Sequence, residues 1–185
     1  MRIISGIHKG RQLTAPKTLP VRPTTDYAKS GLFNMLASRY NFKKLKVVDL
    51  FAGTGSITYE FLSRGCEHLV AVDNHPACIK FINSTLELLQ APKSIMAIQS
   101  DALTWLKKTD RTFDIIFADA PFDQTPAESL AEIVFERNLL NKNGVLIIEH
   151  GSTNNLSPLK NYIETRKYSQ VSFSFFKNET DTDIT

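Results

Sequence analysis

The sequence predicts an α/β protein with a doubly wound, mostly parallel seven-stranded sheet, and three observations lead to this fold. From residue 45 onward, short apolar runs rich in β-branched residues alternate with helix-like stretches, which is typical of a parallel sheet. The runs are apolar almost throughout, as at 145–148, and this indicates strands that are covered on both faces. Right-handed crossovers between parallel strands then favour a doubly wound topology.

The elements of this sheet follow one another along the chain. Apolar runs bounded by turn-forming residues predict strands at 46–51, 68–73, 94–99, 113–119 and 144–149. Apolar residues at helical spacing predict helices at 56–63, 76–90, 102–108, 127–137 and 154–162. Strict alternation at 171–176 predicts a terminal strand, with 164–169 as its hairpin partner.

An appendage made of a hairpin and one helix is expected before the sheet. Residues 2–13 read as two short strands around a turn that Gly10 supplies. Three prolines within 15–23 make an extended connector. The polar residues 24–26 are N-cap residues ahead of apolar side chains at helical spacing within 28–36, which predicts a helix there.

The net charge of +3 is unevenly distributed along the chain. Residues 1–46 carry ten Lys or Arg and one acidic residue, whereas residues 47–185 are acidic overall. We therefore expect two parts, a basic N-terminal appendage at 1–44 and a main domain at 45–185. A basic segment on an acidic body indicates a polyanionic partner such as nucleic acid. A charged surface that only keeps the protein in solution is the plainer alternative.

The composition argues against several classes of protein. With 42% hydrophobic and 22% charged residues, the chain falls near the globular average, which argues against disorder and a fibrous fold. No apolar run reaches the roughly 18 to 20 residues of a membrane span, and the first residues lack the apolar core of a secretory signal. Two cysteines cannot make a disulfide framework and lack the partners for a zinc site. We therefore expect a cytoplasmic monomer with no membrane partner and no metal.

Four acidic residues lie where consecutive predicted strands end: Asp49, Asp73, Asp101 and Asp119. Any one of them alone would be read as an ordinary helix cap. Because ligands of open α/β sheets bind outside the carboxyl ends of the strands, the four carboxylates together should line one site. Such an acidic rim suits a ligand with positive charge, and S-adenosylmethionine carries a sulfonium and an ammonium group. Asp73 would in addition accept hydrogen bonds from two ribose hydroxyls.

The turn after the first predicted strand contains two glycines. Gly53 and Gly55 let the backbone approach a ligand closely, although such a pair also occurs in plain tight turns. A dinucleotide-binding turn has Gly or Ala at the third small position, whereas this chain has Thr58 there. The turn therefore favours S-adenosylmethionine over a nicotinamide dinucleotide.

Residues 49–55, Asp-Leu-Phe-Ala-Gly-Thr-Gly, resemble the first motif of class I methyltransferases. From residue 1 to about residue 150, the chain resembles the bacterial enzymes that methylate guanine N2 in 16S ribosomal RNA. The other matching blocks are Arg-Ile-Ile-Ser-Gly at 2–6, Gly-Arg at 10–11, Arg-Pro-Thr-Thr-Asp at 22–26, Leu-Phe-Asn at 32–34 and Ser-Arg-Gly at 63–65. The chain departs from the family at 29–31, and it has Asp-Ala-Pro-Phe at 119–122 where the family has Asp-Pro-Pro and an aromatic residue.

The resemblance implies that S-adenosylmethionine lies along the tips of the first three strands. The glycines would pass its methionine part, Asp73 would hold the ribose hydroxyls, and Asp101 would contact the adenine amine. The implied cofactor-binding residues are Asp49, Phe51, Ala52, Gly53, Gly55, Asp73, Asn74, Asp101, Ala102 and Asp119.

Catalysis is expected at residues 119–122. The Asp119 carboxylate and the Ala120 carbonyl would accept the two N–H groups of the guanine amine. Pro121 would restrain the loop, and Phe122 would stack on the flipped base unless it is a core aromatic. Beside this pocket, seven residues would hold phosphates of 16S ribosomal RNA within a small-subunit particle: Arg2, Lys9, Arg11, Lys17, Arg22, Thr24 and Thr25.

Three other functions stay open on the sequence alone. An adenine-N6 methyltransferase acting on DNA or RNA uses the same kind of strand tip, and only the N-terminal blocks favour ribosomal RNA. A nicotinamide-dependent oxidoreductase is disfavoured by Thr58 and the acidic rim. An RNA-binding assembly protein with weakened catalysis is kept open by Ala120.

Overall fold

A computed structural model of the chain describes residues 1–16, 19, 25–120 and 127–178. Within these residues a single sheet has the strand order β3-β2-β1-β4-β5-β7-β6. The strands are β1 (Lys46–Leu50), β2 (His68–Asp73), β3 (Ile95–Gln99), β4 (Phe113–Ala118), β5 (Leu140–Gly151), β6 (Tyr162–Tyr168) and β7 (Val171–Phe176). The first five are parallel, and the terminal hairpin of β6 and β7 adds an antiparallel edge beside β5. The predicted α/β sheet is confirmed.

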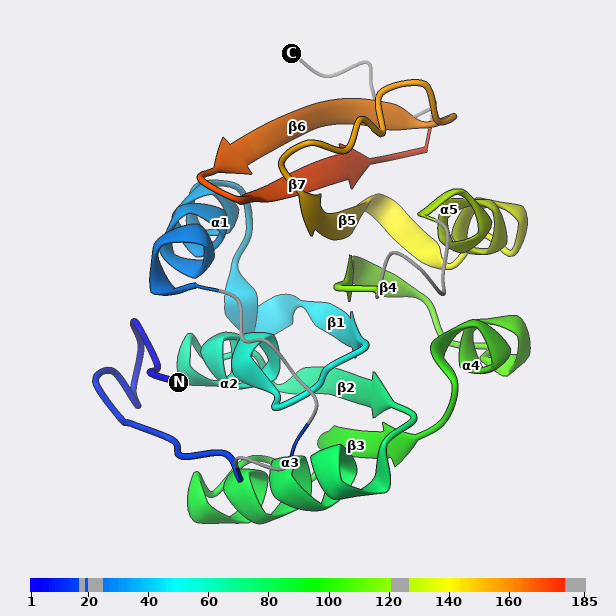
Figure 1. Cartoon of the computed structure of the whole chain (residues 1–185). Coiled ribbons are helices and arrows are strands. Elements are labelled where there is room, and N and C mark those ends of the chain that lie inside the picture. The colour runs from blue at the N-terminus through cyan, green and yellow to red at the C-terminus, as the bar shows by residue number, and fades with distance from the viewer. Residues whose placement is uncertain (17–18, 20–24, 121–126, 179–185) are drawn as a thin grey trace.

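Helices cover both faces of this sheet (Figure 1). One face packs against α1 (Asp26–Arg39), α2 (Ser56–Ser63) and α3 (Pro76–Leu88), and the other against α4 (Ala102–Lys108) and α5 (Ala127–Glu136). A short 3₁₀ helix, Phe42–Lys44, leads from α1 into β1.

Two hydrophobic cores follow from this arrangement, because successive side chains of a strand point to opposite faces. Ile115 belongs to the core under α1, α2 and α3, and its neighbour Ile116 to the core under α4 and α5. None of the described helices is long and apolar enough to cross a membrane.

The predicted helix at 154–162 is wrong. The chain there forms successive turns, closed by hydrogen bonds from Asn154 N to Gly151 O and from Leu159 N to Leu156 O. The Asn155 side chain accepts from Ser157 N, as in an Asx turn. Pro158 also disfavours helical backbone at the residue before it. These turn-forming residues outweigh the helical spacing of the apolar ones.

The two arms of the predicted N-terminal hairpin pair through an antiparallel bridge between Arg2 and Gln12 and through reciprocal bonds between Met1 and Leu13, although neither arm is a regular strand. Between these residues the two arms also bond to each other, from Ile3 N to Arg11 O at 3.0 Å and from Gly10 N to Ile3 O at 2.9 Å, and part of the first arm bonds to α2. The amides of Ile4 and Ser5 donate to the Glu60 carboxylate, at 2.8 and 3.1 Å. Further along, the amide of Ile7 donates to the carbonyl of Ser63 at 2.7 Å. The N-terminal segment therefore lies along α2, and Ile3 and Leu13 join the same core as α1 and the sheet.

The glycine within α1 is explained by the terminal hairpin. A Cβ atom at Gly31 would lie 2.0 Å from Cε1 of Tyr168, at the end of β6. That tyrosine ring is held by two aromatic neighbours, with centroids 5.8 Å from Tyr27 and 5.7 Å from Phe173. Glycine at position 31 weakens the helix but allows α1 to pack closely against the hairpin.

We expect Gly31→Ala to destabilise the protein, although alanine favours a helix by about 1 kcal/mol. The added methyl overlaps the Tyr168 ring, which packs on Tyr27 and Phe173, and overpacking of this kind typically costs about 1 to 3 kcal/mol. Urea unfolding measures the change, with Tyr168→Ala and the double variant as controls. If the clash is the cause, Gly31→Ala lowers stability less when Tyr168 is already alanine. A single variant more stable than the parent would contradict the packing argument.

Candidate active site

The turn between β1 and α2 has an unusual backbone. Phe51, Gly53 and Gly55 all have positive φ, at 58°, 55° and 79°, a region that non-glycine residues rarely adopt. Gly55 is the N-cap of α2, and a Cβ atom there would lie 2.6 Å from Cζ of Tyr59. Both the φ and the packed Tyr59 ring therefore require glycine at 55.

Asp73 braces this turn from the tip of β2. One carboxylate oxygen accepts from Gly53 N at 2.8 Å, and the other accepts from His75 N, also at 2.8 Å. The backbone adds a bond from Ala52 N to Val72 O at 3.1 Å. Since an ionised carboxylate offers about four acceptor positions, roughly two remain for a ligand.

Asp49 lies within the sheet, one residue before the end of β1, and is 2% exposed. Its carboxylate accepts from both the backbone N and the hydroxyl of Thr58, at 3.0 and 2.6 Å. Thr58 thus ties β1 to the first turn of α2, a role that its position in the glycine turn did not reveal. The pKa of Asp49 is raised to about 7, chiefly by burial; the Thr58 hydrogen bonds lower it and the charges of Asp119 and Asp73 raise it.

Asp119 follows the end of β4, and its backbone N donates to Leu50 O at 3.4 Å. Burial raises the pKa of its carboxyl group to about 6. Asp49 and Asp119 are thus two carboxyl groups at the ends of adjacent strands, and burial disfavours the charged form of each unless a positive group lies nearby. A cation bound beside these two groups would favour their charged forms.

The tip of β3 differs from the other strand ends. Asp101 is exposed and is the N-cap of α4, accepting from Thr104 N at 2.8 Å. This hydrogen bonding lowers the pKa of Asp101, so the group stays charged. Its neighbour Ala102 is buried, and Asn74 O accepts from the Gln99 side chain at 3.5 Å, which links the tips of β2 and β3.

Several predicted site residues lie outside the part of the chain that the structure describes. These are Pro121 and Phe122 of the catalytic loop and Lys17, Arg22 and Thr24 of the basic segment. Thr25 is described as the N-cap of α1, where its hydroxyl accepts from Ala28 N at 3.2 Å.

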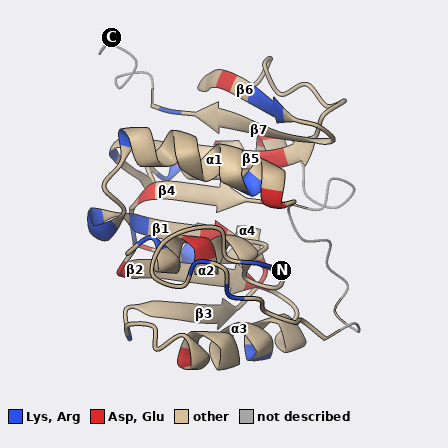
Figure 2. Ribbon diagram, turned by 90° about the vertical axis from the view of Figure 1, so that its left-hand side faces the viewer, with Lys and Arg blue, Asp and Glu red and all other residues tan. Residues whose placement is uncertain are grey.

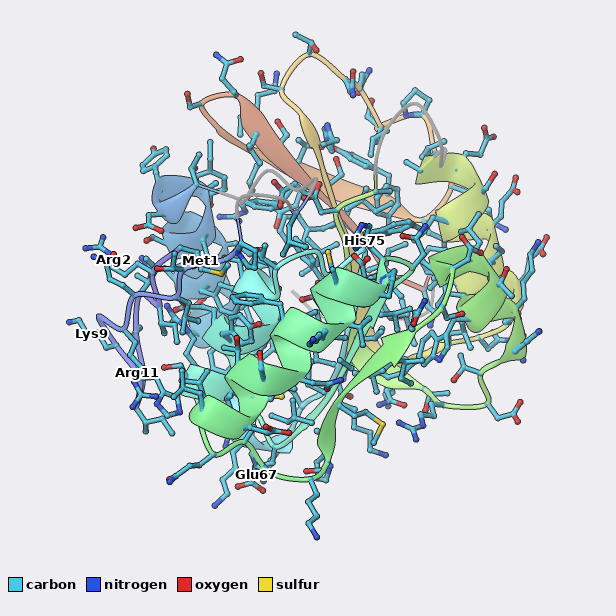
Figure 3. The ribbon with its side chains drawn as sticks, turned by 60° about the horizontal axis from the view of Figure 1, so that its bottom comes forward. Met1, Arg2, Lys9, Arg11, Glu67 and His75 are labelled. Carbon is cyan, nitrogen blue, oxygen red and sulfur yellow. The ribbon has the colours of Figure 1, made fainter. Side chains whose placement is uncertain are left out.

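Two of the basic residues lie away from the carboxyl edge of the sheet. Arg11 donates to the carbonyl of Leu88, at the far end of α3 from His75. Since α3 has 13 residues, that end is about 20 Å from the helix N-terminus. Figure 3 shows Lys9 and Arg11 together on one side of the molecule, away from His75. The expectation that Lys9 and Arg11 lie beside the pocket is therefore wrong, because the N-terminal segment docks along α2 down to Ser63.

Sequence reasoning did not identify the buried pair of Lys29 on α1 and Glu60 on α2, whose side chains are 1% and 0% exposed. The sequence did contain a sign that Lys29 is buried, because Lys29 lies on the same helical face as the apolar Leu32 and Leu36. Figure 2 shows α1 and the N-terminal segment crossing in front of the sheet on the side of α2.

Comparison with known proteins leads to the same family of ribosomal RNA methyltransferases as the N-terminal sequence motifs. The family described as "Conserved hypothetical protein 95" matches residues 1–177. YlbH of Bacillus subtilis, named provisionally as an rRNA methyltransferase, is 35% identical over 153 residues, which are 81% of this chain and 82% of YlbH. Ribosomal RNA small subunit methyltransferase D of Buchnera aphidicola is 29% identical over 182 residues, covering 96% of this chain and 92% of that protein.

A solved structure supports the relationship. The yhhF protein of Escherichia coli, provisionally called a methyltransferase, superposes with a TM-score of 0.82 at 27% identity, over 95% of this chain and 96% of yhhF. The chain therefore belongs to the family described as "Conserved hypothetical protein 95", and its resemblance to the small-subunit ribosomal RNA methyltransferases is confirmed.

Proposed function

We propose that this protein transfers the methyl group of S-adenosylmethionine to the exocyclic N2 amine of a guanine in 16S ribosomal RNA. The observation that carries the proposal is the placement of the Asp49, Asp73 and Asp119 carboxyl groups at the ends of the adjacent strands β1, β2 and β4, beside the glycine turn; the pKa values of Asp49 and Asp119 are raised to about 7 and about 6. One relative is named as a methyltransferase of small-subunit ribosomal RNA, and a site that favours a cation suits a sulfonium cofactor.

The described residues fit this cofactor by the chemistry of their donors. We assign the methionine part to the turn at Gly53 and Gly55, the ribose hydroxyls to the free acceptor positions of Asp73, and the adenine amine to Asp101. Phe51, Ala52, Asn74 and Ala102 border the same edge. When bound, S-adenosylmethionine would supply a methyl group made electrophilic by its sulfonium.

The protein's part in transfer is to orient the amine. The lone pair of an exocyclic base amine is delocalised into the ring, so the nitrogen is a poor nucleophile. The Asp119 carboxylate accepts one N–H and the Ala120 carbonyl the other, which turns the lone pair toward the methyl group. The proton leaves after transfer, when the methylated nitrogen has become acidic. The base must be flipped out of its stack to reach this point.

We expect cofactor affinity to depend on pH. Because the pKa of Asp49 is raised to about 7 and that of Asp119 to about 6, lowering the pH through this range protonates both groups. A cationic ligand binds the ionised form better, so affinity should rise with pH up to about 7 and then level off. Calorimetry from pH 5 to 8 measures this for S-adenosylmethionine and for S-adenosylhomocysteine, which lacks the sulfonium charge. An equal pH dependence for both ligands would contradict a role for the sulfonium.

RNA affinity is expected to fall steeply as salt rises, because the N-terminal segment would bind phosphates and release counterions. Lys9→Ala and Arg11→Ala should each reduce the slope of log K against log salt concentration by about 1. Lys107→Ala, an exposed lysine on α4 across the sheet, is the matched control. If affinity does not depend on salt, the basic segment is only a solvated surface.

The function itself is tested by incubating purified protein with labelled S-adenosylmethionine and small-subunit particles, and then digesting the RNA to nucleosides. We expect label in N2-methylguanosine. Label in N6-methyladenosine would instead support the adenine methyltransferase that the sequence left open.

A further inference from the structure

A buried group of charges joins the N-terminal segment to the helix that follows the glycine turn. The Lys29 ammonium lies 3.9 Å from Oε2 of Glu60. Glu60 also accepts from Nε of Arg64, the residue that follows α2, at 2.9 Å. Charges enclosed to this degree are rare unless they are paired and hydrogen-bonded. None of the cofactor-site residues described above belongs to this group.

Lys29 contacts two other parts of the chain, the N-terminal segment and α2. From α1, its Nζ donates to the carbonyl of Arg2 at 2.7 Å and to the hydroxyl of Ser56 at 3.1 Å. Ser56 is the first residue of α2 and directly follows Gly55, which closes the glycine turn. One ammonium group thus bridges the start of the N-terminal segment and the end of the glycine turn.

Arg2 connects this bridge to the surface. While its carbonyl is held by Lys29, its side chain is 54% exposed and its guanidinium pairs with Asp26 at 3.1 Å. A phosphate that engages the Arg2 guanidinium therefore acts on the residue that Lys29 holds. Two residues further on, the Glu60 carboxylate accepts from the amides of Ile4 and Ser5, so a shift of this segment would disturb its bonds to α2.

We infer that Lys29 is a positioning residue that couples RNA binding by the N-terminal segment to ligand binding at the glycine turn. This inference rests on the proposed function. Ordering of Arg2 by a phosphate steadies Lys29 and, through Ser56, the end of the turn. Because linkage is reciprocal, the cofactor site then strengthens RNA binding by the same factor. A lysine that served only to stabilise the fold would change the unfolding free energy and leave this coupling factor unaltered.

The coupling factor is the ratio of two dissociation constants for S-adenosylhomocysteine, measured by calorimetry without and with a 16S ribosomal RNA transcript. This ligand has no methyl group to transfer, so the RNA stays unmodified. For the parent protein we expect a factor of about 5 or more, within the usual range of allosteric coupling. For Ser56→Ala, which removes one hydroxyl and leaves Lys29 its contacts with Arg2 and Glu60, we expect a factor below about 2.

Two further variants sharpen the test. Lys29→Met should abolish the coupling, and Lys29→Arg should restore part of it. Lys43→Met removes the same charge from an exposed lysine that pairs with Glu67 at 3.6 Å, and it should keep the parent's factor. If Lys29→Met does not fold, Ser56→Ala still decides.

An unchanged factor in Ser56→Ala, or a parent factor of one with both ligands bound, would overturn the inference and leave the proposed function standing. A parent protein that binds neither the transcript nor small-subunit particles would instead refute the proposed function.

Discussion

Asp119→Ala is expected to lower the rate of methyl transfer by about 10² to 10³, the usual cost of losing one preorganised partner in an active site. The carboxylate follows β4, where it is placed to accept an N–H of the guanine amine. Without it, that N–H is unpaired in a closed site and the lone pair is no longer directed at the methyl group. Single-turnover methylation of small-subunit particles measures the rate.

Cofactor affinity separates this role from a general defect. Asp119→Ala should change the dissociation constant of S-adenosylmethionine far less than the rate, and Asp119→Asn should show an intermediate defect because it keeps one acceptor oxygen. Asp110→Ala is the matched control, because the Asp110 side chain is 98% exposed and its ion pair with Arg137 Nη2 is long, at 3.8 Å. Near-normal transfer by Asp119→Ala would remove this residue from the mechanism.

Asp73→Ala is expected to weaken cofactor binding by about 1.5 to 3 kcal/mol, the range for hydrogen bonds to a charged group. The substitution removes the proposed partner of the ribose hydroxyls and also the bond that holds Gly53 N. Calorimetry with S-adenosylmethionine measures the loss. Asp73→Asn, which can still accept from Gly53 N, should lose less, and unchanged affinity in Asp73→Ala would place the ribose elsewhere.

The sheet was predictable because burial on both faces makes its strands continuous apolar runs. β2 matches its predicted range, and β1 and β4 each end one residue early. β5 begins at Leu140, four residues before the predicted start. The prediction missed this part because residues 141–143 are polar and interrupt the apolar run. The pairing of β5 with β4 also shifts its register there, between Phe113 and Ile115. The predicted helix at 154–162 failed for a similar local reason, because the residues around Pro158 form turns although the apolar residues have helical spacing.

The candidate site was predictable where topology alone brings residues together. Any parallel sheet places the tips of adjacent strands at one edge, so Asp49, Asp73 and Asp119 needed no knowledge of side-chain packing. The path of the N-terminal segment depends on its docking to Glu60 and Ser63, and nothing local in the sequence records that contact.

The most direct test of the central claim is mass spectrometry of 16S ribosomal RNA from a strain that lacks this protein. We predict that one N2-methylguanosine disappears from the 16S molecule and returns when the parent gene is supplied, but not when the Asp119→Ala gene is supplied. Retention of every N2-methylguanosine in the deletion strain would contradict the proposed function.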